Sequence, residues 1–271
     1  MSRRRPAGLQ GSASPRAPLA YRFVVALAKF LNWAFFRFRM TLEGAENLPR
    51  TGGWIAAPLP HRRWIDPFLL VMRLPIEPRI VFFGDGRVLF LTPFRRFLFR
   101  LIGGVVPVWP KGGVGAFGPH VDAAGRVLDA GAVFVLFPEA GPPSPPDRAR
   151  EIKAGIGYVA LRTGAPIVPI LIGGTTELYR GRRLVLRILP AVSALELADV
   201  PPGPAPERES AREREVARAV ASGLDALTAP PIAALHHEVE ARSTADRRRW
   251  TWLTHWLDLE WEGDRPHRPT D

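Results

Sequence analysis

His61 and Asp66 are the residues whose types and spacing best suit acid–base chemistry. They lie in the segment PLPHRRWIDPFLL (58–70), where a short apolar run gives way to a helical pattern. Five residues of regular helix turn two side chains apart by about 140°, so the pair can meet only if His61 precedes the helix. A carboxylate bound to one ring nitrogen orients an imidazole and stabilises its charged form. The other nitrogen can then take a proton from a hydroxyl group.

The pair is a catalytic triad without its serine, so this chemistry requires the substrate to supply the nucleophile. A single H-x4-D is weak evidence by itself, because a helix-capping histidine beside a solvated aspartate gives the same pattern. No G-x-S-x-G is present, which disfavours a serine hydrolase. The chain has no cysteine, which excludes disulfides, cysteine-held metals and thioester intermediates on the protein.

Short apolar runs alternate with helix-length segments along the middle of the chain. This rhythm predicts an α/β domain with a largely parallel, buried sheet, whose active site lies where strands end and helices begin. The predicted strands are 52–59, 79–83, 104–108, 132–137, 166–172 and 184–189, and the predicted helices are near 65–73, 91–102, 114–130 and 152–163.

Further motifs follow the histidine in a fixed order. After PHRRWID come a strand leading to WPK (109–111), then FPEAGPP (137–143), a helix start at KAG (153–155) and a strand PIVPILI (166–172). As an ordered set they resemble the glycerolipid acyltransferases typified by 1-acylglycerol-3-phosphate acyltransferase, whose motifs are similar to N-H-x-S-x-x-D and F-P-E-G-T-R-S. The opening LEGAENLP (42–49) is also similar, so the resemblance covers about 40–190.

The resemblance implies transfer of a fatty acyl group from a thioester to a hydroxyl of a lysophospholipid-type acceptor, on a mixed, largely parallel sheet flanked by helices. His61 matches the general base and Asp66 its partner. The donor is acyl-CoA or an acyl carrier protein as co-substrate, and no metal or cofactor is implied. The positions that match acceptor or substrate contacts are Arg63, Lys111, Glu139, Gly141 and Lys153.

Two departures from the family pattern concern the acceptor. Pro110 and Pro142 stand where the family often has arginines that hold a phosphate, and Arg63 replaces a common serine. Proline offers neither charge nor a backbone donor. Either another cation takes over (Arg63, Lys111, Arg148 or Arg150), or lysophosphatidate is not the best acceptor.

The remaining segments flank this acyltransferase domain, which we place at 41–195. Residues 1–18 read as a disordered basic arm, 19–40 as an amphipathic helix, 196–210 as a linker, and 211–271 as a helical C-terminal extension. The helix over 19–40 suits either a membrane interface or docking on its own domain. The tryptophan-rich tail at 247–261 favours packing on the domain over a second interfacial contact.

The net charge of +11 favours anionic partners such as membrane lipids. Nucleic acid is not expected, because the arginines are scattered and no recognition motif occurs. Neither a membrane span nor a signal peptide is expected, so the predicted location is cytoplasmic and peripheral, on the inner face of the cell membrane. A non-catalytic lipid-binding or scaffolding protein with the same fold is the alternative to an enzyme.

Overall fold

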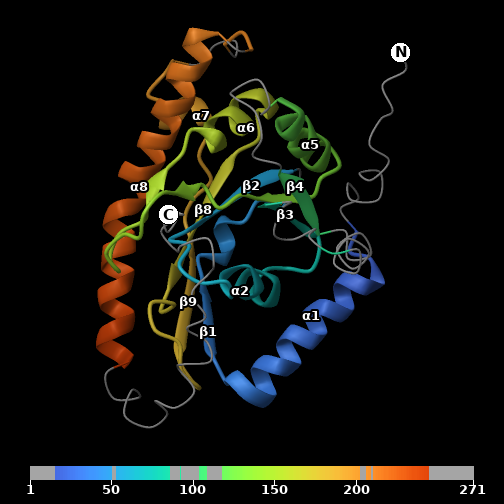
Figure 1. Cartoon of the computed structure of the whole chain (residues 1–271), viewed down its shortest axis with the longest axis vertical. Coiled ribbons are helices and arrows are strands. Elements are labelled where there is room, and N and C mark those ends of the chain that lie inside the picture. Colours follow the sequence, from blue (N-terminus) through green and yellow to red (C-terminus); the bar gives the residue numbers. More distant parts are fainter. Residues whose placement is uncertain are drawn as a thin grey trace, which may run out of the picture.

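The computed structural model describes residues 16–50, 53–85, 92, 104–108, 118–201, 206–208 and 210–243. Within these ranges seven strands form one sheet, in the order β1-β9-β8-β2-β5-β3-β4 (Figure 1). Neighbouring strands are parallel except for β8 and β9, which confirms the expected mixed, largely parallel sheet. The strands are β1 (Arg39–Glu43), β2 (Trp54–Leu59), β3 (Ile80–Asp85), β4 (Val105–Val108), β5 (Val133–Val135), β8 (Ile167–Gly173) and β9 (Arg183–Ile188).

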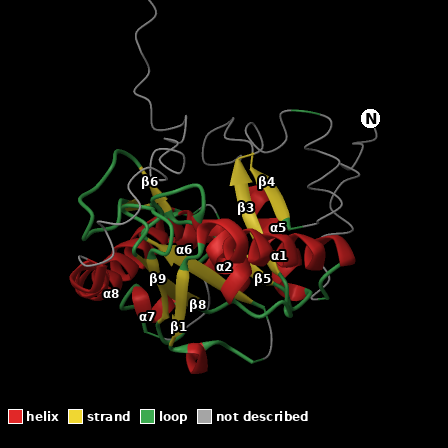
Figure 2. Ribbon diagram, turned by 90° about the horizontal axis from the view of Figure 1, so that it is seen from below, coloured by secondary structure: helices red, strands yellow, loops and turns green. Residues whose placement is uncertain are grey.

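Helices cover both faces of the sheet and enclose two apolar clusters. One cluster joins the sheet to α5 (Gly118–Asp129), α6 (Gly155–Thr163) and α8 (Ala211–Ser243). The other joins it to α1 (Leu19–Leu31) and α2 (Asp66–Arg73). Strands β3 and β4 form one end of the sheet and β9 and β1 the other (Figure 2). The expected flanking helices are therefore present on both faces.

The central strands are buried because both faces are covered. All six residues of β2 and all seven of β8 are buried, and both strands read as continuous apolar runs. Each of the six predicted strands corresponds to an observed one. Three strands were not predicted: β1 and the small antiparallel pair β6 (Glu139–Ala140) and β7 (Glu151–Ile152). The helix predicted near 91–102 lies outside the described residues.

The N-terminal segment departs from the predicted helix over 19–40. Helix α1 continues into a π-helical turn, Asn32–Phe36, and Arg37 then adopts a left-handed conformation with φ 57°. The Asn32 side chain accepts a hydrogen bond from the Phe38 N–H at 3.0 Å, which fixes the turn into β1. Arg39 and Met40 therefore belong to the sheet. Most of the predicted disordered arm lies outside the described residues, but Ala17 is buried.

One face of α1 packs on the domain and the other is exposed. Tyr21 and Val25 are buried, and burial raises the pKa of the Tyr21 phenol to about 12, although a hydrogen bond with the Ile80 backbone and the nearby Arg79 oppose the rise. By length and composition Leu19–Phe36 is also sufficient to cross a membrane, which the sequence analysis did not expect. The large exposed side chains of this segment are Leu19, Phe23, Leu27, Phe30, Leu31, Trp33 and Phe35.

The C-terminal segment is part of the core. The short helix α7 (Ala194–Leu197) begins with a capping box of Ser193 and Glu196. It spans the predicted boundary between the domain, which ends at 195, and the linker, which begins at 196. Helix α8 then runs along one face of the sheet (Figure 1). Its buried apolar side chains join the same cluster as α5 and α6: Val216, Ala217, Val220, Ala221, Leu224, Ile232, Leu235 and Val239. The predicted tail beyond Ser243 lies outside the described residues.

Candidate active site

His61 and Asp66 meet at the carboxyl end of β2. His61 Nδ1 lies 2.9 Å from Asp66 Oδ2. His61 follows the strand through Pro60, and Asp66 is the first residue of α2, with Pro67 next to it. The chain thus curls before the helix begins, as the spacing of the pair requires.

Main-chain donors hold the Asp66 carboxylate in place. Its Oδ2 also accepts hydrogen bonds from the N–H groups of Arg62 at 2.7 Å and Arg63 at 2.9 Å. The side chain is fully buried. A buried carboxylate is stabilised by such donors and by the positive end of a helix N-terminus. Three donors on one oxygen fix the carboxylate beside the ring.

The imidazole of His61 is accessible from one side. Its side chain is 36% exposed, whereas that of Asp66 is fully buried. The Phe137 ring packs against the His61 imidazole, with ring centroids 4.2 Å apart. Phe137 follows β5, the neighbour of β2 in the sheet. The ring is therefore oriented by protein on one side and open to a reactant on another.

Glu139 braces the main chain on which His61 lies. Its Oε2 accepts the His61 N–H, and its Oε1 accepts the Arg150 N–H at 2.6 Å. Burial raises the pKa of the Glu139 carboxyl, while these two hydrogen bonds and the nearby Arg62 guanidinium oppose the rise. The motif glutamate thus ties the ends of β2 and β5 to the segment before β7, and its two oxygens are occupied by main chain.

The other predicted site residues are placed around this centre. Arg63 Nη2 donates to the Thr176 carbonyl at 2.9 Å, in the loop after β8. Gly141 has φ 100°, a conformation that favours glycine, at the start of the loop between β6 and β7. Lys153 is half-exposed and pairs with Glu151, while its N–H donates to the Pro138 carbonyl. Lys111 lies outside the described residues.

Arg62 was not predicted as a site residue. Its Nη1 donates to the Ser144 carbonyl at 3.1 Å, and its Nη2 donates to the carbonyls of Pro145, at 2.6 Å, and Arg148. Burial lowers the pKa of Arg62, and the Glu139 carboxylate opposes that change. The only hint of this role in the sequence is that Arg62 directly follows the candidate catalytic histidine. Its three partners are backbone carbonyls, which any residue type supplies, so their positions cannot be predicted from the sequence.

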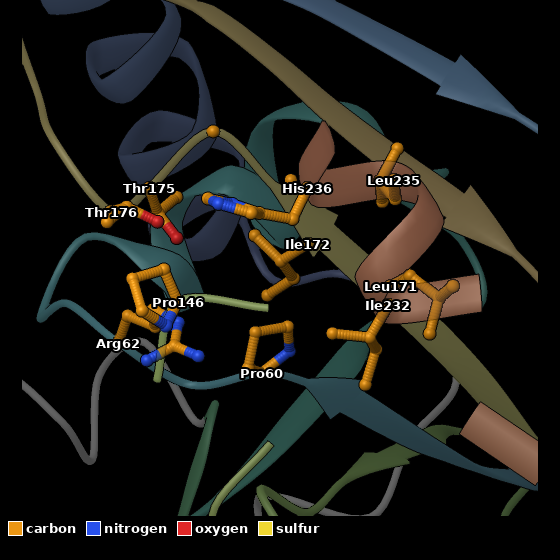
Figure 3. A pocket seen from close by; sticks show the side chains of 12 residues that line it. Pro60, Arg62, Pro146, Leu171, Ile172, Thr175, Thr176, Ile232, Leu235 and His236 are labelled. Carbon is orange, nitrogen blue, oxygen red and sulfur yellow. The ribbon is translucent and has the colours of Figure 1, made fainter. Parts of the chain in front are cut away.

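A small hollow is lined in part by this arginine (Figure 3). Pro60 and Arg62 come from the loop after β2, and Pro146 from the loop between β6 and β7. The rest of the lining comes from β8 and the loop after it (Leu171, Ile172, Gly173, Gly174, Thr175 and Thr176) and from α8 (Ile232, Leu235 and His236). The hollow therefore places α8 next to the loops that carry the candidate site.

The family model described as Acyltransferase matches residues 39–173, which run from β1 to the end of β8. One similar solved structure is the 1-acyl-sn-glycerophosphate (LPA) acyltransferase PlsC from Thermotoga maritima, with 20% identity and a TM-score of 0.49. The match covers 77% of this chain and 81% of that one. The family match over residues 39–173 shows that the chain carries an acyltransferase-family domain.

Proposed function

We propose that the protein transfers a fatty acyl group from a thioester donor, acyl-CoA or acyl carrier protein, to a hydroxyl of a lysophospholipid-type acceptor. The observation that carries the proposal is the 2.9 Å contact between Nδ1 of the accessible His61 ring and the buried Asp66 carboxylate. With Nδ1 held in this way, Nε2 is the nitrogen that receives a proton.

In this mechanism His61 Nε2 takes the proton of the acceptor hydroxyl while the hydroxyl oxygen attacks the thioester carbonyl carbon. The carbon–sulfur bond then breaks, and the proton returns from the ring to the leaving thiolate. Asp66 stabilises the imidazolium between these two steps. Because a thioester is already activated, a base and a positioned hydroxyl supply most of what the reaction requires.

The test is an acyl-transfer assay on purified His61→Ala and Asp66→Asn, with each donor class tested in turn. His61→Ala should lower kcat by roughly a thousandfold or more, and Asp66→Asn should leave a small residue of activity. His237→Gln, an exposed histidine on α8, is the matched control and should retain wild-type turnover. Unchanged turnover in folded His61→Ala would refute this mechanism. A wild-type protein that binds lipid but never transfers an acyl group would support the non-catalytic alternative.

The acceptor follows from the same site. Pro142 is exposed in the loop after Glu139, and it supplies no charge for a phosphate monoester. We therefore propose that a lysophospholipid with a larger headgroup is a better acceptor than lysophosphatidate. A panel of acceptors at fixed donor decides this, and the highest kcat/KM for lysophosphatidate would contradict it.

A membrane surface is the proposed partner of α1 and of the π-helical turn that follows it. Phe23 is 67% exposed, Trp33 65% and Phe35 61%, while Tyr21 and Val25 on the other side are buried against the domain. A helix docked in this way, with exposed aromatic residues and the exposed cations Lys29 and Arg37, suits binding in the plane of an anionic bilayer. This supports a peripheral location on the inner face of the cell membrane.

Vesicle co-sedimentation tests the membrane proposal on the full chain. The triple variant Phe23→Ser, Phe30→Ser and Trp33→Ser should lose binding to vesicles that contain phosphatidylglycerol. Leu227→Ser is the control, because Leu227 is an exposed apolar residue of α8. Binding by the wild type should weaken as salt rises from about 0.05 to 0.5 M. Equal binding by the triple variant and the control would contradict the proposal.

A further inference from the structure

Arg62 connects the candidate base to the loop between β6 and β7. Three carbonyls of the segment 144–148 accept hydrogen bonds from its guanidinium, and the Ser144 hydroxyl donates to the Arg148 carbonyl at 2.9 Å. Two residues beyond this segment the Arg150 N–H donates to Glu139, which also binds the His61 N–H. The Arg62 side chain thus holds segment 144–148 itself, and Glu139 joins the residues after it to the His61 main chain.

The fork geometry of the side chain makes this attachment specific. A guanidinium presents five N–H donors in one plane, and three carbonyl acceptors are met here by two of its nitrogens. A lysine ammonium is a point donor and does not reproduce a planar fork. Both terminal nitrogens of Arg62 bind protein carbonyls, so its contacts here serve the loop.

The segment so held carries an exposed cation, and its main chain is bound by the side chain of the residue that follows the base. The Arg148 side chain is exposed, while its own carbonyl is bound by Arg62. In a lysophospholipid the phosphate lies only a few bonds from the hydroxyl that must reach His61. In coenzyme A a long pantetheine arm separates the phosphates from the thioester. A cation on a segment tied to the residue after the base is therefore better suited to the acceptor phosphate than to the phosphates of coenzyme A.

We propose that Arg62 is a positioning residue for the acceptor. It fastens segment 144–148 beside His61, so that Arg148 meets the anionic headgroup at a fixed distance from the base. This inference rests on the proposed acyl transfer. Its effect belongs to acceptor binding, because its guanidinium binds the carbonyls of the loop that carries Arg148.

The kinetic test compares Arg62→Met, Arg148→Gln and the double variant. Arg62→Met should raise the acceptor KM by about tenfold and change kcat by less than about twofold. The double variant should be no worse than the poorer single variant, because both changes remove one interaction. An unchanged KM, a loss confined to kcat, or effects that multiply in the double variant would overturn the proposal.

Two further variants separate positioning from charge and from stability. Arg62→Lys keeps the charge but loses the fork, and its KM should stay above that of the wild type. Arg187→Met removes a guanidinium that joins Glu43 and Glu238 on another part of the sheet. It should lower Tm and leave the acceptor KM unchanged. Full recovery in Arg62→Lys, or an equal rise of KM in Arg187→Met, would count against positioning by Arg62.

Limited trypsin digestion measures how firmly the loop is held, and it does not depend on acyl transfer. Arg62→Met should accelerate cleavage of the Arg148–Ala149 bond, measured by mass spectrometry, whereas Arg187→Met should not. If the wild type transfers no acyl group, the proposed function fails, while the cleavage rate still decides whether Arg62 holds the loop. Unchanged cleavage at Arg148 would overturn the inference in either case.

Discussion

At the scale of single residues, two carboxylates organise the site by accepting main-chain hydrogen bonds. Asp66 receives the N–H groups of Arg62 and Arg63, and Glu139 receives those of His61 and Arg150. Charged acceptors form stronger hydrogen bonds with backbone donors than neutral ones do. Asp66 and Glu139 therefore both hold the main chain of the loop after β2. Because this main chain is fixed, the position of the His61 imidazole is fixed as well.

Replacing Glu139 by glutamine tests this brace. The glutamine oxygen can accept one of the two N–H groups, but its amide nitrogen would face the other. We expect Glu139→Gln to lower the free energy of unfolding by about 1–3 kcal/mol. Urea denaturation measures the change. Glu151→Gln is the control, because Glu151 is an exposed carboxylate on the paired strand of the same hairpin. Equal free energies of unfolding for the two variants would show that the hydrogen bonds of Glu139 do not stabilise the fold.

The sequence predicted the contact of His61 with Asp66 because the two residues are close along the chain. A strand end, a proline and a helix start leave few ways to place a carboxylate five residues after an imidazole. Arg62 could not be assigned in the same way. Its acceptors lie 82, 83 and 86 residues further along the chain and are backbone carbonyls, which every residue possesses.

At the scale of elements, the main difference from the sequence-based prediction is at the start of the sheet. The residues RFRM (37–40) continue the apolar and basic pattern of α1, so periodicity alone extends the helix through them. Two features end it: the left-handed Arg37 and the pairing of β1 with β9. The second depends on a strand more than 140 residues away, which no local pattern reveals.

Close contact between α6 and α8 depends on Gly157. A Cβ added there would lie 2.4 Å from the Ala217 carbonyl oxygen. We expect Gly157→Ala to force the helices apart and to destabilise the protein by about 1–3 kcal/mol. Gly118→Ala in α5 is the control, since nothing lies within 4 Å of its added Cβ. Denaturation midpoints compare the two, and equal midpoints would refute this account of the contact.

The packing of α8 against the loop after β8 also predicts a pH effect. Burial lowers the pKa of His236 below its ordinary value of 6.5, although Glu240 opposes the change. Below pH 6.5 the unfolded chain therefore binds a proton at this residue more readily than the folded one. Stability contributed by neutral His236 is complete above pH 6.5 and is lost as the pH falls.

Tm measured at pH 7.5 and at pH 5.5 tests this effect. The wild type should lose more Tm on acidification than His236→Gln, which has no group to protonate at this position. Other titrating residues contribute equally to both proteins, so the difference between the two losses isolates His236. Equal losses would contradict the predicted effect.

At the scale of the whole molecule, the acyltransferase unit extends beyond the segment that carries its motifs. The predicted domain ends at residue 195, because the proline-rich stretch that follows resembles a linker. Sequence composition shows a break in the pattern, but it does not show whether the next helix returns to the sheet. Here α8 does return: Arg162 and Glu213 form a buried ion pair between α6 and α8, and Arg182 binds Glu240.

A chain that ends at residue 210 should therefore fail to fold cooperatively. It would expose the apolar faces of α6 and β8 that Val216, Leu224 and Leu235 now cover, and each buried side chain of this size contributes about 1.5–3 kcal/mol. It would also leave Arg162 and the fully buried Arg182 without their carboxylate partners. Together these losses are of the same order as the roughly 5–15 kcal/mol by which folded proteins are stable. Near-UV circular dichroism and thermal unfolding of the truncated and full-length chains measure the outcome. A cooperative transition near the wild-type Tm in the truncated chain would mean that α8 is an appendage after all.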